Sequence, residues 1–107
     1  YRIVTFERNG KDIFQEWLKS LRDITAKKAI NRAVLRMADG NFGDHKFCRD
    51  GVSELRIHVG AGYRVYYSVS GNEIIVLLCG GDKQTQSKDI DKAVEYLQNF
   101  KEENNYE

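Results

Sequence analysis

The chain has 107 residues, of which 41% are hydrophobic, and a formal net charge of +1 at pH 7. This size and composition allow one domain, expected to span residues 1–107, to bury a core without disulfides or bound metal. An apolar run of 18 residues is absent, which argues against a membrane-spanning helix, and the small net charge argues against a binder that depends on bulk attraction to nucleic acid.

The two cysteines, Cys48 and Cys79, have neither metal-binding nor redox spacing. Separated cysteines of this kind are typical of reduced thiols, and residues 1–10 lack the pattern of a secretion signal, so we expect a cytoplasmic protein. The histidines and acidic residues also lack the spacing of a metal site such as HExxH. We therefore expect no metal ion and no cofactor.

Hydrophobic periodicity predicts an α+β domain with the element order β-α-α-β-β-β-α. The alternation of residues 2–7 predicts a short strand. Apolar residues at helical spacing predict helices over 11–22 and about 25–39, joined as an antiparallel hairpin. Gly40 stands at the expected C-terminal cap of the second helix.

The second half of the chain is predicted to form most of the sheet. Residues 41–51 are expected to be a polar loop, and residues 54–59 and 63–69 are expected to be strands around a Gly60-Ala61-Gly62 turn. The strand over residues 73–79 is apolar on both faces, which places it inside a mostly antiparallel sheet.

A final helix is predicted to begin at Ser87 or Asp89 and to pack on the sheet. Its apolar stripe comprises Ile90, Ala93, Val94, Leu97 and Phe100. We expect its end, residues 102–107, to fray.

Strand alternation gathers unusual polar side chains on one face of the sheet, opposite the face of Leu55 and Ile57. With a three-residue turn, Arg56 is expected opposite Tyr66 and His58 opposite Arg64. Cations on one face repel unless an anion joins them, which suits a phosphate-bearing partner such as RNA. Lys83, which follows two glycines that permit close approach, and the loop residues His45, Lys46 and Arg49 are expected to border the same site.

Each of these residues also has a structural interpretation. Arg56 could pair with Glu54, Tyr66 could cover the sheet, Lys83 could be a solvated turn residue, and both histidines could be ordinary half-exposed side chains. Residues 1–36 carry a net charge of +5. Their cations at helical spacing could form a solvated face or a contact surface for RNA phosphates; they are Lys28, Arg32 and Arg36.

Five motifs follow one another along the chain: Phe14-x-x-Trp17-Leu18, Gly40-Asn41-Phe42-Gly43-Asp44, Glu54-Leu55-Arg56-Ile57, Gly62-Tyr63-Arg64-Val65-Tyr66-Tyr67 and Leu78-Cys79-Gly80-Gly81-Asp82-Lys83-x-x-Gln86. The combination and order of these motifs resemble those of the RelE/ParE toxin superfamily. The chain is most similar to the phage-derived Gp49-like, HigB-type branch of addiction module killer proteins. The resemblance covers nearly the whole chain.

The resemblance implies a RelE-like, microbial RNase-like fold and the toxin half of a type II toxin–antitoxin pair. The partner it implies is a cognate antitoxin, often of the helix-turn-helix type. Basic residues of the RNA-cleaving branch match Arg56, Arg64 and Lys83. Two differences stand out: Glu54 replaces a further basic residue, and no Tyr or His follows Lys83 closely, so His58, His45 and Tyr66 are the alternatives for the proton donor.

These observations predict a metal-independent, ribosome-dependent mRNA endoribonuclease that blocks translation. The RNA 2′-OH would attack the adjacent phosphorus and leave a 2′,3′-cyclic phosphate and a 5′-OH. Arg56 and Arg64 would stabilise the phosphorane, and Lys83 would hold the phosphate or transfer a proton. The cations of the second predicted helix would bind ribosomal RNA. The alternative is a ParE-like inhibitor of DNA gyrase without nuclease activity.

Overall fold

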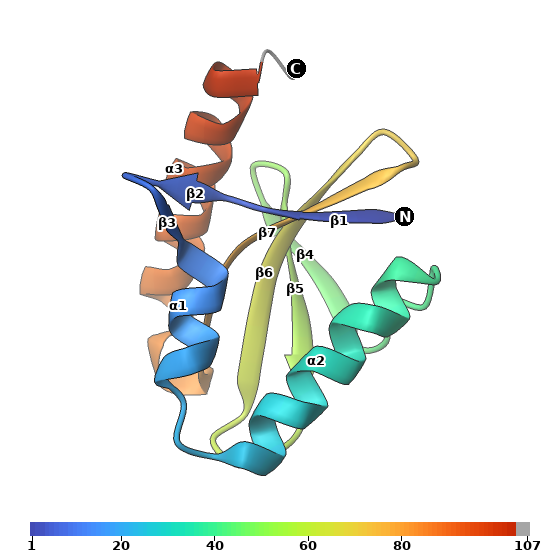
Figure 1. The fold of residues 1–107 in the computed structure, drawn as a ribbon, viewed down its shortest axis with the longest axis vertical. Coiled ribbons are helices and arrows are strands. Elements are labelled where there is room, and N and C mark those ends of the chain that lie inside the picture. Colours follow the sequence, from blue (N-terminus) through green and yellow to red (C-terminus); the bar gives the residue numbers. More distant parts are fainter. Residues whose placement is uncertain (105–107) are drawn as a thin grey trace.

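A five-stranded sheet with strand order β1-β7-β6-β5-β4 carries the fold of the computed structural model, which describes residues 1–104 (Figure 1). β1 pairs with β7 in parallel, and the other three pairings are antiparallel. The prediction of a mostly antiparallel sheet is confirmed. Its strands are β1 (Arg2–Thr5), β4 (His45–Arg49), β5 (Val52–Ile57), β6 (Tyr63–Ser70) and β7 (Ile74–Gly81).

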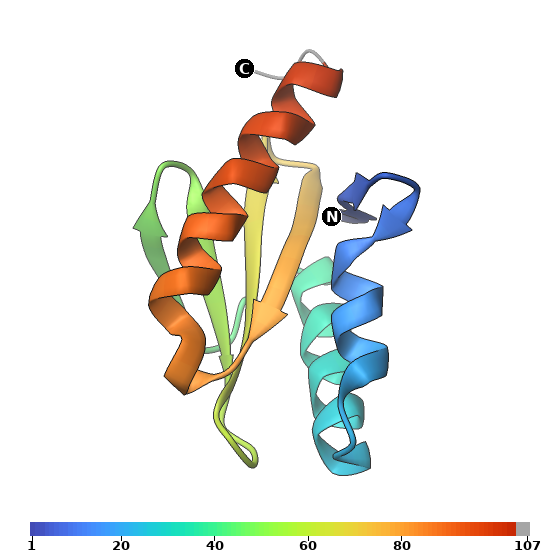
Figure 2. The same ribbon diagram turned by 90° about the vertical axis from the view of Figure 1, so that its left-hand side faces the viewer.

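Helices cover both faces of this sheet (Figure 2). α1 (Ile13–Ser20) and α2 (Ile24–Ala38) lie on one face, and α3 (Gln86–Asn104) lies on the other. The carboxylates of Asp12 and Asp23 cap the first two helices by accepting backbone N–H groups that have no partner inside the helix. The two predicted helices are present in succession, but strands and not the helical pair form the N-terminal part of the chain.

Two hydrophobic clusters form the core, one on each face of the sheet. Leu55 and Val65 belong to the cluster beneath α1 and α2, and Val52 and Leu78 belong to the cluster beneath α3. β7 contributes to both clusters, because its successive apolar side chains point to opposite faces. This explains its continuous apolar sequence and confirms its place inside the sheet.

The predicted element order was incomplete at the N-terminus. The two-residue strands β2 (Glu7–Arg8) and β3 (Lys11–Asp12) form a hairpin ahead of α1, so the helix begins later than predicted. Asn9 and Gly10 form its turn with φ of 55° and 75°. A pair of two-residue strands leaves no periodicity to detect in the sequence.

The prediction of a polar loop over residues 41–51 was also wrong, since β4 lies within it. β4 is an edge strand with β5 as its one neighbour in the sheet, and most of its side chains are exposed. Phe47, its largest apolar residue, is 63% exposed. The alternation that identifies a half-buried strand is therefore missing from its sequence.

The observed register between β5 and β6 differs from the predicted one. β5 ends at Ile57, which pairs with Tyr63, and the intervening turn has five residues instead of three. The turn is closed by hydrogen bonds from Val59 N to Ile57 O and from Gly62 N to Val59 O. As a result Arg56 faces Arg64 directly, while Glu54, not Arg56, faces Tyr66.

The chain turns from β7 into α3 through a short 3₁₀ helix, η1 (Lys83–Thr85), whose N-terminus is capped by Asp82. α3 therefore begins at Gln86, ahead of both predicted starts, and continues to Asn104. The segment predicted to fray is helical over residues 102–104, and its residues 105–107 lie outside the described part. None of the helices in residues 1–104 is long and apolar enough to cross a membrane.

Candidate functional site

Three predicted cations meet at one end of the sheet. Arg56, Arg64 and Gly81 are consecutive cross-strand neighbours on β5, β6 and β7, and Lys83 follows Gly81 by two residues. A Cβ atom placed on Gly62 would lie 3.5 Å from Cβ of Lys83 and 4.0 Å from Nη1 of Arg64. Lys83 and Arg64 therefore lie beside the same turn, as the sequence predicted.

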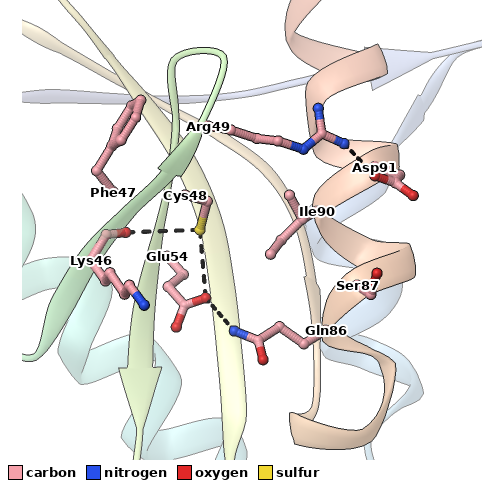
Figure 3. Close-up of a pocket in the computed structure, with 9 residues that line it drawn as sticks. All are labelled: Lys46, Phe47, Cys48, Arg49, Glu54, Gln86, Ser87, Ile90 and Asp91. Carbon is pink, nitrogen blue, oxygen red and sulfur yellow. Dashed lines mark hydrogen bonds and ion pairs between the residues drawn. The ribbon is translucent and has the colours of Figure 1, made fainter.

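The carboxylate of Glu54 holds the two arginines. Its Oε2 accepts hydrogen bonds from Nε of Arg56 at 2.7 Å and from Nε of Arg64 at 3.4 Å. Its Oε1 accepts from Nε2 of Gln86 at 2.7 Å and from Sγ of Cys48 at 3.5 Å (Figure 3). Glu54 is 1% exposed, and burial opposes its ionisation, but the hydrogen bonds led by that from Arg56 keep its pKa below the ordinary value.

One carboxylate shared between two guanidinium groups leaves a net positive charge. Nη1 of Arg64 donates to Gly62 O at 3.1 Å, and Nη1 of Arg56 lies 3.9 Å from Oδ1 of Asp44. Within residues 1–104, Nη2 of either arginine has no acceptor, and the exposed Lys83 has no ion-pair partner. The site therefore retains donors for an incoming anion.

His58 lies just beyond the end of β5, with its side chain 73% exposed. Its Nε2 lies 2.5 Å from Oδ2 of Asp44, and this hydrogen bond is the main cause that lowers the pKa of the Asp44 carboxyl. An ionised carboxylate can only accept, so Nε2 carries a proton, and Nδ1 is the nitrogen that accepts whenever the ring is neutral. This arrangement suits a general base.

Tyr66 does not fit the predicted role of proton donor. Its side chain is 0% exposed, in the core cluster beneath α3. Its buried hydroxyl has no hydrogen-bond partner among the described residues, and burial raises its pKa. A substrate at the surface cannot reach this hydroxyl, because the sheet alternation that faces it towards the site also places it under α3.

The three residues predicted from the supposed loop lie on or at the end of β4 and differ in availability. Lys46 is exposed opposite Glu54, and Nδ1 of the exposed His45 lies 3.0 Å from Gly43 O. Arg49 instead forms ion pairs with Asp50 and with Asp91 on α3 (Figure 3). The guanidinium of Arg49 therefore has two carboxylate partners and connects α3 to the edge strand β4.

A cavity of about 250 Å³ lies between β4 and the start of α3, beside Glu54 (Figure 3). Its walls include the exposed ring of Phe47, the amide of Gln86 and the thiol of Cys48. Burial, reinforced by the charge of Glu54, raises the pKa of Cys48 to about 11. Cys48 is therefore a neutral thiol at physiological pH and not a nucleophile.

The glycine pair before Lys83 serves internal packing. A Cβ atom on Gly80 would overlap the indole ring of Trp17 from α1, and one on Gly81 would overlap the carboxylate of Asp89 from α3. The close approach expected from the sequence is therefore made by the protein's own side chains on both faces. These contacts fix the end of β7 and the position from which Lys83 extends.

The predicted cations of α2 are all exposed, and within residues 1–104 none of them forms an ion pair. Arg32 and Arg36 border a groove that also contains Arg56, whereas Lys28 does not line it. The described residues contain no group of three or more His, Cys, Asp or Glu side chains that could hold a metal ion.

Sequence reasoning missed two residues that organise the site. Glu54 was noted as a departure from the basic pattern and as a possible partner of Arg56, but not as the acceptor shared by both arginines. Asp44 was noted only within a motif, although it orients His58 and approaches Arg56. The sequence contained a signal for the role of Glu54, because Glu54 and Arg56 are two residues apart on one strand and so share a face. The role of Asp44 depends on the path of residues 41–44 beside β5.

Comparison with known proteins identifies a family and a relative. The model of a family described as phage-derived protein Gp49-like (DUF891) matches residues 16–99. A protein of Haemophilus influenzae (strain ATCC 51907 / DSM 11121 / KW20 / Rd), named as an uncharacterized protein, is 50% identical over 80 residues. The match covers 75% of this chain and 81% of the relative.

Proposed function

We propose, from the premise that the chain belongs to the family of phage-derived Gp49-like proteins, that it is the toxin of a type II toxin–antitoxin pair and cleaves mRNA. One observation carries the proposal: Arg56 and Arg64 converge on a single carboxylate beside the unpaired Lys83. Two arginines that share one buried counterion, with a third cation beside them that has no counterion, form a site for a phosphodiester.

The arginines stabilise the charge that develops during cleavage. As the 2′-oxygen bonds to phosphorus, the non-bridging oxygens gain negative charge, and preorganised donors lower the barrier. Because Nε of each guanidinium is held by Glu54, the outer nitrogens are preorganised for these oxygens. Removal of one such donor costs about 10²–10³ in rate in comparable sites.

Proton transfer falls to His58 and Lys83. Nδ1 of His58 accepts the proton of the 2′-OH as the new oxygen–phosphorus bond forms, while Asp44 holds the ring. The bond from phosphorus to the 5′-oxygen then breaks, and the ammonium group of Lys83 supplies the proton that this oxygen needs. The products are a 2′,3′-cyclic phosphate and a 5′-OH, and the steps need no metal ion.

The proposed partners are the ribosome, which would present the mRNA, and an antitoxin of the helix-turn-helix type. Crowded cations repel one another in the free protein and are relieved when RNA binds. This favours low activity on free RNA and higher activity when the ribosome positions the strand. The dependence is tested by comparing cleavage of one mRNA with and without ribosomes.

Induced expression tests the proposed function. Wild-type protein should arrest growth and cut transcripts, and the double variant Arg64→Ala, Lys83→Ala should do neither. The matched control is Arg2→Ala, Lys11→Ala, which removes the same charge from exposed positions on other strands. Growth arrest by the site variant with intact transcripts would refute the nuclease, and DNA breaks in those cells would indicate the gyrase inhibitor instead.

A further inference from the structure

A groove of about 340 Å³ runs between α2 and the end of β5. Arg32 and Arg36 line it from α2, and Arg56, His58 and Asp44 line it from the sheet side. The two sides meet because α2 crosses the face of the sheet near this end (Figure 1). Arg56 and His58 are common to the groove and to the candidate site.

The charges of the groove favour an anion. Arg32 and Arg36 are exposed and, in the described part of the chain, have no ion-pair partner. The groove's one carboxylate, Asp44, is already bound to His58 and lies near Arg56. An arginine pair in a concave site with free donors is suited to bidentate contact with phosphate oxygens.

We propose that this groove is a second phosphate subsite, in which Arg32 and Arg36 bind the backbone of the same RNA strand that Arg56 and Arg64 hold at the scissile linkage. The inference rests on the proposed function for the identity of the strand. It assigns the two arginines to the substrate and leaves Lys28, on the same helix, outside the binding track.

The position of Lys28 provides a matched control. All three cations are exposed on α2 and each substitution removes one positive charge, but Lys28 does not line the groove. A general electrostatic effect of α2 would weaken RNA binding equally for Lys28→Gln, Arg32→Gln and Arg36→Gln. A subsite weakens it only for the arginine variants.

Fluorescence anisotropy with 2′-O-methyl oligonucleotides tests the subsite without cleavage, because these strands lack the attacking hydroxyl. Wild-type protein should bind a five-nucleotide strand more tightly than a dinucleotide. Each arginine variant should lose about tenfold in affinity for the longer strand, as expected for a lost charged hydrogen bond. The salt dependence should fall by about 0.7 in log–log slope for each lost contact. Lys28→Gln should retain the wild-type affinity.

The outcomes separate this inference from the proposed function. Equal affinities for the wild type and the Arg32→Gln, Arg36→Gln double variant, equal losses for Lys28→Gln, or no binding by the wild type would each overturn the subsite. An effect of the arginine variants on antitoxin binding alone would do the same. Groove-dependent binding by a protein that leaves mRNA intact in cells would support the subsite and refute the nuclease.

Discussion

Arg56 and Arg64 face each other directly across β5 and β6, and Nε of each donates to the same oxygen of Glu54. Two like charges at adjacent cross-strand positions are unfavourable without a counterion. Glu54 supplies it from the same face of the sheet, buried where solvent cannot replace it. The stability of the fold and the geometry of the candidate site therefore depend on one side chain.

Glu54→Gln should destabilise the protein and disorder the arginines. Removing one member of a buried charge network leaves the others uncompensated, and we expect a loss of about 3 kcal/mol in the free energy of unfolding, the lower end of the usual range because both arginines keep some solvent contact. Urea denaturation measures this loss in the free energy of unfolding. Glu73→Gln, at an exposed position, is the control and should change little; a similar small effect for both would show that Glu54 does not hold the pair.

Acid should weaken the wild-type fold through the same carboxylate. The folded protein holds the pKa of Glu54 below its ordinary value of 4.5, so the unfolded chain binds more protons as the pH falls. The contribution of Glu54 is complete above pH 4.5 and is lost as the pH falls through its lower folded value. Stability measured against pH should decline less steeply in Glu54→Gln than in the wild type, and parallel curves would contradict this.

His58→Ala should reduce cleavage, whereas His45→Ala should not. The loss of a general base costs about 10²–10⁴ in rate. His45 is also exposed, but its Nδ1 lies against the Gly43 carbonyl and it has no carboxylate to orient it. Single-turnover cleavage on ribosomes compares the two. Asp44→Asn should shift the pH profile of this reaction, because Asp44 acts by positioning His58.

If His45→Ala is as inactive as His58→Ala, the assignment of the base is wrong. If Asp44→Asn lowers the rate at every pH equally, Asp44 has a structural role only. All three variants should retain the wild-type melting temperature within a few degrees, since these side chains are exposed.

Gly80→Ala should destabilise the protein more than a glycine-to-alanine substitution in an ordinary strand does. The added methyl group overlaps the ring of Trp17, and overpacking of this kind costs about 1–3 kcal/mol. Trp17→Leu should relieve part of the cost, so the two substitutions should couple favourably in a double-mutant cycle. Additive effects on the free energy of unfolding would show that the ring does not restrict residue 80.

The sequence was most informative where side-chain periodicity reflects burial. The stripe of α3 and the two-sided apolar pattern of β7 both correspond to the observed core, because burial on a fixed geometry leaves a repeat in the sequence. β4 left no repeat, since its Phe47 faces solvent and no strand of residues 1–104 lies beyond it in the sheet.

Three cations of the candidate site were predicted to lie together, but the side chains that connect them were not predicted. Arg56, Arg64 and Lys83 could be placed together from strand alternation, yet their register depended on the length of one turn. The burial of Tyr66 and the bond between Arg49 and Asp91 depend on where α3 crosses the sheet. Such contacts between distant segments follow from packing and have no local pattern.

Trp17 is the one tryptophan in the chain. Its ring lies against Gly80, two positions before Asp82, which caps η1, and the ring centroid is 6.3 Å from that of Tyr63, the first residue of β6. The protein thus carries a native fluorophore at the junction between its hydrophobic interior and the cationic end of the sheet. Quenching or a spectral shift of this single tryptophan, excited at wavelengths that tyrosine does not absorb, can follow ligand titrations in unlabelled material.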